Sequence, residues 1–293
     1  MNAAKPHRDT IVVEDAEVLS HTAHPGEQYV LRLRAPEIAA RARPGAFVHL
    51  RCAPALAMRR PMSIMLVDAR QGSFDILFKA HGHGTAELAQ RRVGERLSVM
   101  GPIGVPFKLA GYRPRPLLIG GGVGIPPMVY LADHLRAVKG VSPFVVMGSE
   151  VPFPFRTQPS RILVPGMPEG VIAAMPLLED WGIPSRLASR QAYAGCFDGL
   201  VTELAARWLD AQDTSAREDV EIFACGPTPM LKAVQALAAR YGLPAQLSLE
   251  EYMACAVGGC AGCTVRVNLP SGPAMKRVCV DGPVFDAAVV EFL

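Results

Sequence analysis

Four of the seven cysteines in this 293-residue chain lie within its last 39 residues. Four residues separate the first two of them, two residues separate the second and third, and fifteen precede the last. This is the order C-x4-C-x2-C…C, which is typical of plant-type two-iron clusters. Thiolates are soft ligands that suit iron, and small residues between them let the backbone wrap closely around a cluster. We therefore predict a [2Fe–2S] cluster held by Cys255, Cys260, Cys263 and Cys279.

Zinc is the alternative occupant for four thiolates in one segment. Structural zinc sites more often use two C-x2-C knuckles, and this segment has only one. A disulfide pair is less favoured, because the first ten residues, MNAAKPHRDT, lack the apolar core of a secretory signal and predict a cytoplasmic, reducing compartment. Of the other cysteines, Cys52 and Cys196 are expected to be buried small hydrophobes. Cys225 ends an apolar strand and is expected either to line a cofactor pocket or to pack there.

The composition excludes other classes of protein. With 50% hydrophobic and 19% charged residues, the chain is long and apolar enough for two or three folded domains. The net charge is only +3 and the sequence has no long Lys/Arg run, so it lacks the basic patch typical of a nucleic-acid-binding protein. The longest apolar run, residues 116–132, contains four Gly and three Pro, which favours a buried strand, turn and helix over a membrane span.

Strand and helix patterns change near Pro114. Residues 10–108 form short alternating segments between Gly and Pro turns, with one short helix near 85–91, and this pattern predicts a small antiparallel barrel. From Pro114 onward, apolar strands alternate with helices, among them helices around 173–181 and 200–211. Such alternation predicts a parallel sheet with helices on both faces.

After Gly242 the sequence becomes rich in Gly and Cys and loses helical periodicity, which predicts a small module folded around its ligand. The expected fold class is therefore multi-domain β plus α/β. We place an antiparallel barrel, a parallel-sheet α/β domain and a C-terminal cluster module at residues 1–110, 111–242 and 243–293.

Three turns carry the residue types that bind phosphate. LLIGGGVGIPPM (117–128) is an apolar strand running into glycines and a helix, where a backbone can approach a pyrophosphate. It does not fit G-x-G-x-x-G in the usual register, so it does not by itself predict an ordinary dinucleotide fold. In the barrel, RRPMS (59–63) and FKAHGHGT (78–85) combine a cation, a hydroxyl and small residues. The planar fork of Arg60 could grip a phosphate while Ser63 donates through its hydroxyl.

The order of these motifs, followed by CGPTPM (225–230) and the four cysteines, resembles a known family. It is similar to the electron-transfer subunits of bacterial dihydroorotate dehydrogenases, which belong to the ferredoxin–NADP reductase superfamily. SLEEYMACAVGGCAGC (248–263) and VCVDGPVF (278–285) are especially close to that family's cluster module. The resemblance covers nearly the whole chain.

The resemblance implies an oxidoreductase subunit that passes electrons from NAD(P)H through FAD and the cluster to a partner flavoprotein. That partner would be the dihydroorotate dehydrogenase catalytic subunit of pyrimidine biosynthesis, in a hetero-oligomer such as a heterotetramer. It implies FAD contacts at Arg60, Pro61, Met62, Ser63, Leu77, Phe78, Lys79, Gly84 and Thr85. It implies nicotinamide-nucleotide contacts at Gly120, Gly121, Gly122, Val123, Gly124, Ile125, Pro126, Cys225, Gly226 and Pro227. No general base is expected, because hydride transfer needs positioning more than proton removal.

Two departures from the family leave alternatives open. Where many members have an acidic stretch that suits NADH, this chain has ASRQAY (188–193), and Ser189, Arg190 and Tyr193 resemble the residues that receive the 2′-phosphate of NADPH. The stretch 151–185 is longer and richer in Pro than expected, which leaves the partner open. The alternatives are the reductase subunit of a ferredoxin-dependent or hydrogenase-type complex and, in another class, a non-catalytic iron–sulfur redox sensor.

Overall fold

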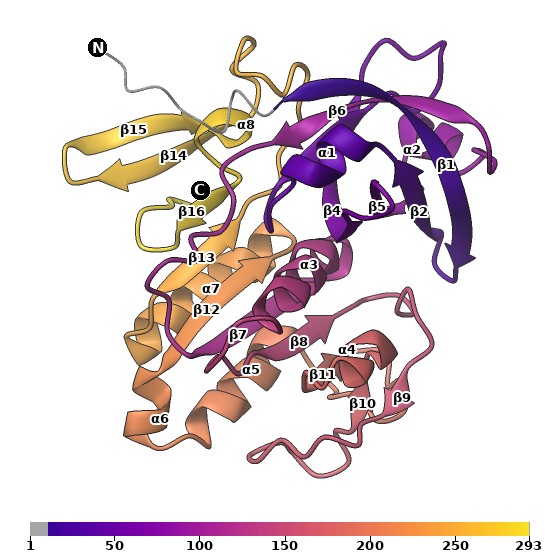
Figure 1. Ribbon diagram of the computed structural model, residues 1–293. Coiled ribbons are helices and arrows are strands. Elements are labelled where there is room, and N and C mark those ends of the chain that lie inside the picture. Colours follow the sequence, from indigo (N-terminus) through magenta and orange to yellow (C-terminus); the bar gives the residue numbers. More distant parts are fainter. Residues whose placement is uncertain (1–10, 293) are drawn as a thin grey trace.

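The computed structural model describes residues 11–292, so the first ten residues, on which the expectation of a missing secretory signal rests, lie outside it. The chain begins with a closed barrel in the strand order β1-β2-β5-β4-β3-β6 (Figure 1). The strands are antiparallel and span Val12–His24 (β1), Gln28–Arg34 (β2), Phe47–Leu50 (β3), Arg60–Asp68 (β4), Ser73–Lys79 (β5) and Arg96–Ile103 (β6). Two short helices, α1 (Pro36–Arg41) and α2 (His83–Leu88), lie between strands. The predicted barrel is confirmed.

Alternating side chains fill the barrel interior. In β2, Leu31 and Leu33 are fully buried, whereas Arg32 between them points outward and forms a two-pronged ion pair with Asp75 of β5 (2.7 and 2.8 Å). Consecutive residues of a strand face opposite sides of the sheet, so this alternation determines which face of β2 lines the barrel interior. The planar guanidinium matches both carboxylate oxygens and locks the register of the two strands.

The second unit is a six-stranded sheet in the order β11-β8-β7-β12-β13-β16. Its strands span Arg115–Gly121 (β7), Phe144–Gly148 (β8), Ser185–Ala188 (β11), Val220–Cys225 (β12), Ala245–Ser248 (β13) and Val284–Asp286 (β16). All neighbours are parallel except β16, which pairs antiparallel with β13. The connecting elements are η2 (Gly122–Gly124), α3 (Ile125–Leu135), α4 (Pro176–Asp180), α5 (Val201–Asp210), α6 (Thr214–Glu218) and α7 (Thr228–Tyr241).

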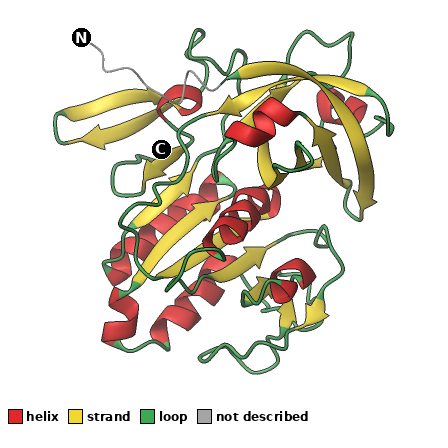
Figure 2. Ribbon diagram, in the orientation of Figure 1, coloured by secondary structure: helices red, strands yellow, loops and turns green. Residues whose placement is uncertain are grey.

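Helices cover both faces of this sheet, as predicted (Figure 2). Leu117 and Ile119 of β7 pack with residues of α5 and α7, whereas Leu118 between them packs with residues of α3. A strand buried on both faces reads as a continuous apolar run, which is what the sequence shows here. The expected fold class, an antiparallel barrel followed by an α/β unit with a mostly parallel sheet, is therefore confirmed.

One expected helix is shorter than its pattern suggests. Residues 173–181 begin as strand β10 (Ala173–Ala174), which pairs with β9 (Gln158–Pro159), and helix α4 starts only at Pro176. Met175 has extended backbone angles (φ −81°, ψ 121°) because a residue before proline is pushed away from the helical region. Pro176 then fits the first helical position, where no N–H partner is needed.

The last part of the chain combines an irregular segment with a hairpin, β14 (Thr264–Leu269) and β15 (Gly272–Arg277), and one helical turn, α8 (Val278–Asp281). This hairpin projects from the molecule in Figure 1. Strands β13 and β16 both follow residue 242 and still belong to the large sheet. The sheet thus takes strands from both sides of the expected boundary at residue 242, and the three-part division stays a prediction.

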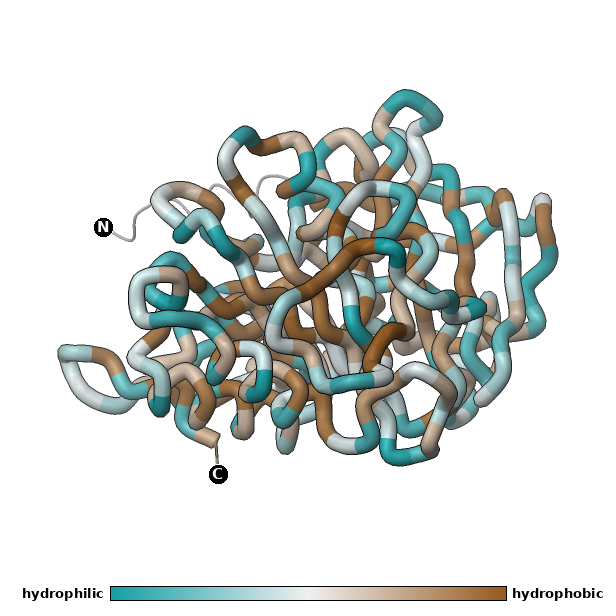
Figure 3. The backbone as a smooth tube through the Cα atoms, turned by 90° about the horizontal axis from the view of Figure 1, so that it is seen from below, coloured by the Kyte–Doolittle hydropathy of each residue, from teal (hydrophilic) through white to brown (hydrophobic). Residues whose placement is uncertain are grey.

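Helix α3 joins the barrel to the sheet. It packs against β4 of the barrel and β7 of the sheet, and Tyr130 donates a hydrogen bond from its hydroxyl to the carbonyl of Ala42 (3.0 Å). A buried tyrosine hydroxyl needs such a partner, and here the bond ties helix to barrel. Figure 3 shows the apolar segments gathered inside the molecule. Within residues 11–292, no helix combines the length and the apolar character that crossing a membrane requires.

Candidate cofactor cavity and cluster loop

A cavity of about 640 Å³ lies where the barrel, the sheet and the segment before the first cluster cysteine meet. The barrel contributes most of the residues expected to contact FAD, namely Pro61, Met62, Ser63, Leu77, Phe78, Lys79 and Thr85. The turns after β7 and β12 contribute Val123 and Pro227, and the segment 248–253 closes the third side. A mostly apolar cavity of this size with a few polar groups suits a cofactor ring. The residues present therefore fit a flavin.

Arg60 and Gly84 lie against each other beside this cavity. A Cβ atom added to Gly84 would stand 2.8 Å from Nε of Arg60, so only glycine lets the guanidinium approach helix α2 this closely. The hydroxyl of Thr85 accepts the N–H of His81 and donates to its carbonyl, both at 2.7 Å. The structure therefore brings together the cation, the glycine and the hydroxyl that the sequence marked as phosphate-binding. Their contact with FAD stays a prediction.

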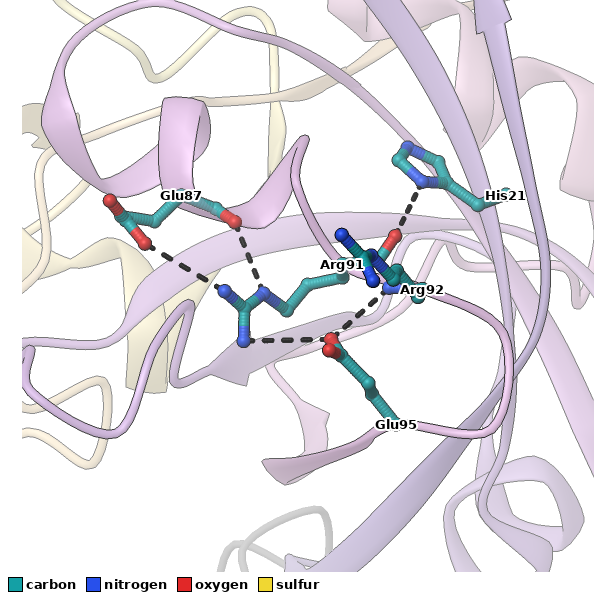
Figure 4. A network of polar contacts seen from close by, with 5 residues as sticks. All are labelled: His21, Glu87, Arg91, Arg92 and Glu95. Atoms are coloured by element: carbon teal, nitrogen blue, oxygen red, sulfur yellow. Dashed lines mark hydrogen bonds and ion pairs between the residues drawn. The ribbon is translucent and has the colours of Figure 1, made fainter.

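A polar network fixes the far end of helix α2 (Figure 4). The guanidinium of Arg91 lies 3.7 Å from the carboxylate of Glu87 and 3.5 Å from that of Glu95. The Arg91 carbonyl meets Nδ1 of His21 in strand β1 at 2.7 Å. Partly exposed ion pairs contribute little energy. Their effect is positional, since they attach the helix that carries Thr85 to the barrel wall.

The two glycine turns at the sheet edge are packed into each other. A Cβ on Gly124 would lie 2.3 Å from the carbonyl oxygen of Cys225, and one on Gly121 would lie 2.4 Å from Sδ of Met230. Gly122 alone of the turn glycines has positive φ (+54°) and open space around its Cβ position. Close packing between turns therefore explains Gly121 and Gly124. Gly122 and the neighbouring Val123 remain the residues of this turn best placed to meet a ligand.

Glu250 is a cavity residue that the sequence analysis missed. It follows β13 directly, and its Oε1 lies 3.7 Å from Sγ of Cys225 at the end of β12. By surface area the side chain is exposed, because it opens into the cavity, although protein atoms surround it closely. Burial raises the pKa of Glu250, and burial together with the Glu250 charge raises the pKa of Cys225 well above its usual range. The signal that could have found it is its place at the carboxyl edge of a parallel sheet, where ligands bind.

The residues expected to bind a 2′-phosphate differ in their accessibility. Ser189 is buried, its hydroxyl donates to the carbonyl of Ser149 (2.7 Å), and it accepts the N–H of Gln191 (3.2 Å). Tyr193 packs edge-on against Phe153 (6.5 Å). Arg190 is exposed at the end of β11. The Arg190 guanidinium is therefore the most exposed of these groups, whereas the Ser189 hydroxyl already bonds the protein backbone, and the binding of a 2′-phosphate here stays a prediction.

The cluster loop has a backbone shaped by left-handed residues. Ala256 (φ +56°), Gly258 (φ +84°) and Ala261 (φ +55°) all adopt conformations that side chains disfavour. These reversals turn N–H groups toward sulfur: Cys260 N lies 3.4 Å from Sγ of Cys255, and Gly262 N lies 3.4 Å from Sγ of Cys260. Such strain persists where the surroundings require it, often at functional sites.

The thiols lie as two pairs, Cys255 with Cys260 and Cys263 with Cys279. Burial tends to raise the pKa of the Cys255 thiol, but backbone and thiol hydrogen bonds outweigh it and lower the pKa to about 6. Burial and the Cys263 thiol raise the pKa of Cys279 to about 12. No three His, Cys, Asp or Glu side chains of residues 11–292 are arranged to hold one metal ion. Two pairs suit two irons with two thiolates each better than a single zinc ion.

His49 is a second residue that the sequence analysis did not mark. It lies in β3, opposite Pro61 of the cavity wall, and is fully buried with neither ring nitrogen in a hydrogen bond of good geometry. Burial and the nearby Arg59 charge lower its pKa to about 4. The backbone of Met253 also faces the ring. A buried unpaired imidazole is costly, and this one sits where the barrel meets the segment that leads to Cys255.

Comparison with known proteins adds a family to this geometry. The model of the iron-sulfur cluster binding domain of dihydroorotate dehydrogenase B matches residues 250–291. The chain is 37% identical over 267 residues to the dihydroorotate dehydrogenase B (NAD(+)) electron transfer subunit of Geobacillus thermodenitrificans, a match that covers 89% of this chain and 92% of the relative. The subunit of the same name from Desulforamulus reducens is 32% identical over 275 residues, with 93% and 96% covered.

Solved structures share the architecture. An NADH-dependent reduced ferredoxin-NADP oxidoreductase aligns with a TM-score of 0.75 at 24% identity and covers 99% of this chain and 91% of its own. The ferredoxin reductase of carbazole 1,9a-dioxygenase aligns with a TM-score of 0.62 at 21% identity, covering 80% and 67%. At these identities the likeness concerns the fold alone, a barrel followed by a mostly parallel sheet covered by helices.

Proposed function

The chain belongs to the family of dihydroorotate dehydrogenase B electron-transfer subunits, and from this premise we propose that it passes electrons between a nicotinamide nucleotide and a partner flavoprotein through FAD and a [2Fe–2S] cluster. The family expected from the order of the motifs is the one that the relatives carry. Their name supports a dihydroorotate dehydrogenase catalytic subunit as the partner, in a hetero-oligomer. It also gives NAD(+) as the nucleotide.

One observation carries this proposal. A single cavity is lined by the barrel, by both sheet-edge turns and by residues 248–253, which run directly into Cys255. Groups that would hold a flavin and a nicotinamide therefore meet around one space, and the segment that leads to the first cluster cysteine forms one of its sides. A flavin, when bound, takes up two electrons as hydride and releases them singly, and an iron–sulfur cluster carries them one at a time.

The residues of this chain supply position rather than acid–base chemistry. Leu77 and Phe78 give an apolar wall for the ring, while Ser63 and Lys79 offer a hydroxyl and a cation along it. Arg60, which lies against Gly84, would hold the diphosphate. The Glu250 carboxyl lines the cavity at the sheet edge where the nicotinamide would enter and would orient it, and the buried Cys225 thiol contacts this carboxyl at 3.7 Å.

Rapid mixing of the purified protein with NADH tests the proposed function. We expect flavin bleaching first and then the absorbance and EPR changes of a reduced two-iron cluster, followed by electron delivery to the co-purified partner. A protein that carries FAD but no iron, or iron but no flavin reduction, would contradict the proposal. A partner of ferredoxin or hydrogenase type would replace its last step.

The nucleotide preference rests on Arg190. Its exposed guanidinium can attract a 2′-phosphate, but the buried Ser189 hydroxyl cannot assist it. We therefore propose that NADH is the main nucleotide and that Arg190 permits some use of NADPH. Arg190→Ala should lower the NADPH:NADH ratio of kcat/KM by roughly 5-fold, the value of one charge-assisted contact of about 1 kcal/mol. An unchanged ratio would remove Arg190 from the site.

We also propose a cytoplasmic location, because four thiols that ligate iron must stay reduced until the cluster is inserted. Cell fractionation with detection of the chain and its partner in one soluble complex tests this. Recovery of the chain outside the cytoplasm with its thiols oxidised would oppose it.

A further inference from the structure

Arg277, the last residue of strand β15, reaches across to the cluster loop. Its Nη1 donates a hydrogen bond to the carbonyl of Gly258 at 2.8 Å. Its own position is held by Asp281, which accepts the Arg277 backbone N–H at 3.0 Å and lies 3.9 Å from its Nε. None of the roles described above uses this arginine.

The acceptor carbonyl belongs to a peptide group that faces a cluster thiol. Gly258 and Gly259 share this peptide: its carbonyl oxygen receives Arg277, and its N–H is the backbone donor of Gly259 directed at Cys255. A Cβ on Gly259 would stand 3.9 Å from Sγ of Cys255, which shows how near this backbone lies to the sulfur. A cation on one end of a peptide polarises it and strengthens the hydrogen bond that the other end donates.

The loop also depends on glycine at this point. Gly258 has φ +84°, and a Cβ there would lie 2.5 Å from Cγ2 of Val280 and 3.4 Å from Nη1 of Arg277. The backbone of Gly258 additionally donates to the thiol of Cys279. One glycine pair thus touches a thiol from each of the two cysteine pairs while Arg277 holds its carbonyl.

We propose that Arg277 is a positioning residue of the cluster site, which fixes the Gly258–Gly259 peptide and raises the reduction potential of the cluster through the N–H that this peptide donates to Cys255. The inference deepens the proposed function and rests on it. Hydrogen bonds to cluster sulfurs and nearby positive charge stabilise the more negative, reduced state. Arg277 supplies the positive charge itself and supports the hydrogen bond through the Gly258–Gly259 peptide.

The test is an EPR-monitored redox titration of the purified protein, comparing wild type with R277Q and R277K. We expect R277Q to have a more negative midpoint potential and R277K, which keeps the charge and one donor, to lie between R277Q and wild type. The rate of flavin reduction by NADH should stay unchanged in both. If R277Q loses its iron, the midpoint potential is measured on R277K instead, and we again expect a more negative value than in the wild type.

R266Q is the matched control. It removes the same charge from the same hairpin, where Arg266 pairs with Glu291 (3.1 Å) rather than with the cluster loop. An R266Q shift as large as that of R277Q, or a wild-type potential in R277Q, would overturn the proposal. Iron and sulfide content distinguishes failure of this proposal from failure of the proposed function. A wild-type protein without a cluster would contradict the proposed function itself.

Discussion

Two glycine-rich segments of this molecule need glycine for different reasons. At the sheet edge, Gly121 and Gly124 have no side chain because the turn after β7 packs into the turn after β12, with the backbone of Cys225 in the way of any Cβ. In the cluster loop, Gly258 has a left-handed backbone conformation. A Cβ atom added to Gly259 or Gly262 would lie 3.9 or 3.5 Å from a thiol sulfur. The first set serves protein packing and the second serves the approach of backbone to sulfur.

The difference shows that a glycine-rich motif alone does not indicate whether its glycines serve packing or ligand binding. GGGVG resembles a phosphate-binding turn, but two of its glycines are needed so that the turn after β7 can pack against the turn after β12. CAVGGCAGC looks like a ligand loop, and its backbone N–H groups do turn toward thiols. The comparison separates a region whose disruption unfolds the protein from a region whose disruption empties a site.

Loss of a cluster cysteine should give the largest effect. Cys279→Ala removes one thiol of the Cys263 pair, so we expect complete loss of bound iron together with the EPR signal of the reduced cluster. Flavin reduction by NADH should persist, because the cavity is built from the barrel and sheet. Iron content and rapid-mixing absorbance measure the two outcomes.

Cys196→Ala is the control for that change. Cys196 is only half-buried, lies near Tyr193 and is remote in sequence from the cluster loop. The variant should keep its full iron content. Equal iron loss in both variants would mean that the cluster depends on general thiol content or stability, and the separation between the two regions would fail.

The same substitution in the two glycine segments should act on different properties. Gly124→Ala places a Cβ 2.3 Å from a backbone oxygen and should lower the free energy of unfolding by about 3 kcal/mol, as overpacking does. Gly258→Ala should cost about 1 kcal/mol for its positive φ, with a further cost for the Cβ that would lie 2.5 Å from Cγ2 of Val280, but its main effect should be a lower iron content after reconstitution. Calorimetry and iron assays on both variants decide. A cluster defect in Gly124→Ala without destabilisation would reverse the assignment.

Acid should weaken the contact between the barrel and the segment that leads to the cluster loop, through His49. Its pKa is lowered from 6.5 to about 4 because the ring is buried beside Arg59. A base with a lowered folded-state pKa contributes stability that is complete above pH 6.5 and is lost as the pH falls toward 4. By 1.36 kcal/mol per pKa unit, that loss is about 3 kcal/mol.

Denaturant unfolding at pH 7, 5.5 and 4 measures this loss. His49→Leu should flatten the pH dependence, whereas His134→Gln, at an exposed position on α3, should keep it. If His49→Leu loses stability with acid as steeply as wild type, other groups carry the effect.

Periodicity and spacing were enough to predict the architecture. Alternation around Leu31 and Leu33 marks a barrel strand, and the continuous apolar run through Leu117 and Leu118 marks a strand covered on both faces. The cysteine spacing points to four thiols in one ligand loop, and the structure places them there as two pairs. These features depend on neighbours in sequence, which is why one chain reveals them.

The features that were missed depend on contacts between distant segments. Gly124 meets Cys225 a hundred residues later, Glu250 meets Cys225 across two strands, and His49 meets the backbone of Met253. The hydrogen bond from the Ser189 hydroxyl to the carbonyl of Ser149, forty residues earlier, is another such contact. No local pattern records which side of a turn faces protein and which faces the cavity.

Gly122 should give the smallest effect and sharpens the comparison within a single turn. It differs from Gly124 two residues later, because no atom lies within 4 Å of its Cβ position and its cost is only the positive φ of +54°. Gly122→Ala should therefore lower stability by about 1 kcal/mol, well short of Gly124→Ala. If Gly122 faces the nucleotide as expected, the added methyl group should also raise KM for NADH without changing flavin content. Calorimetry paired with steady-state kinetics tests both parts. A loss of stability as large as that of Gly124→Ala would mean that packing governs the whole turn and leaves no residue of it open to a ligand.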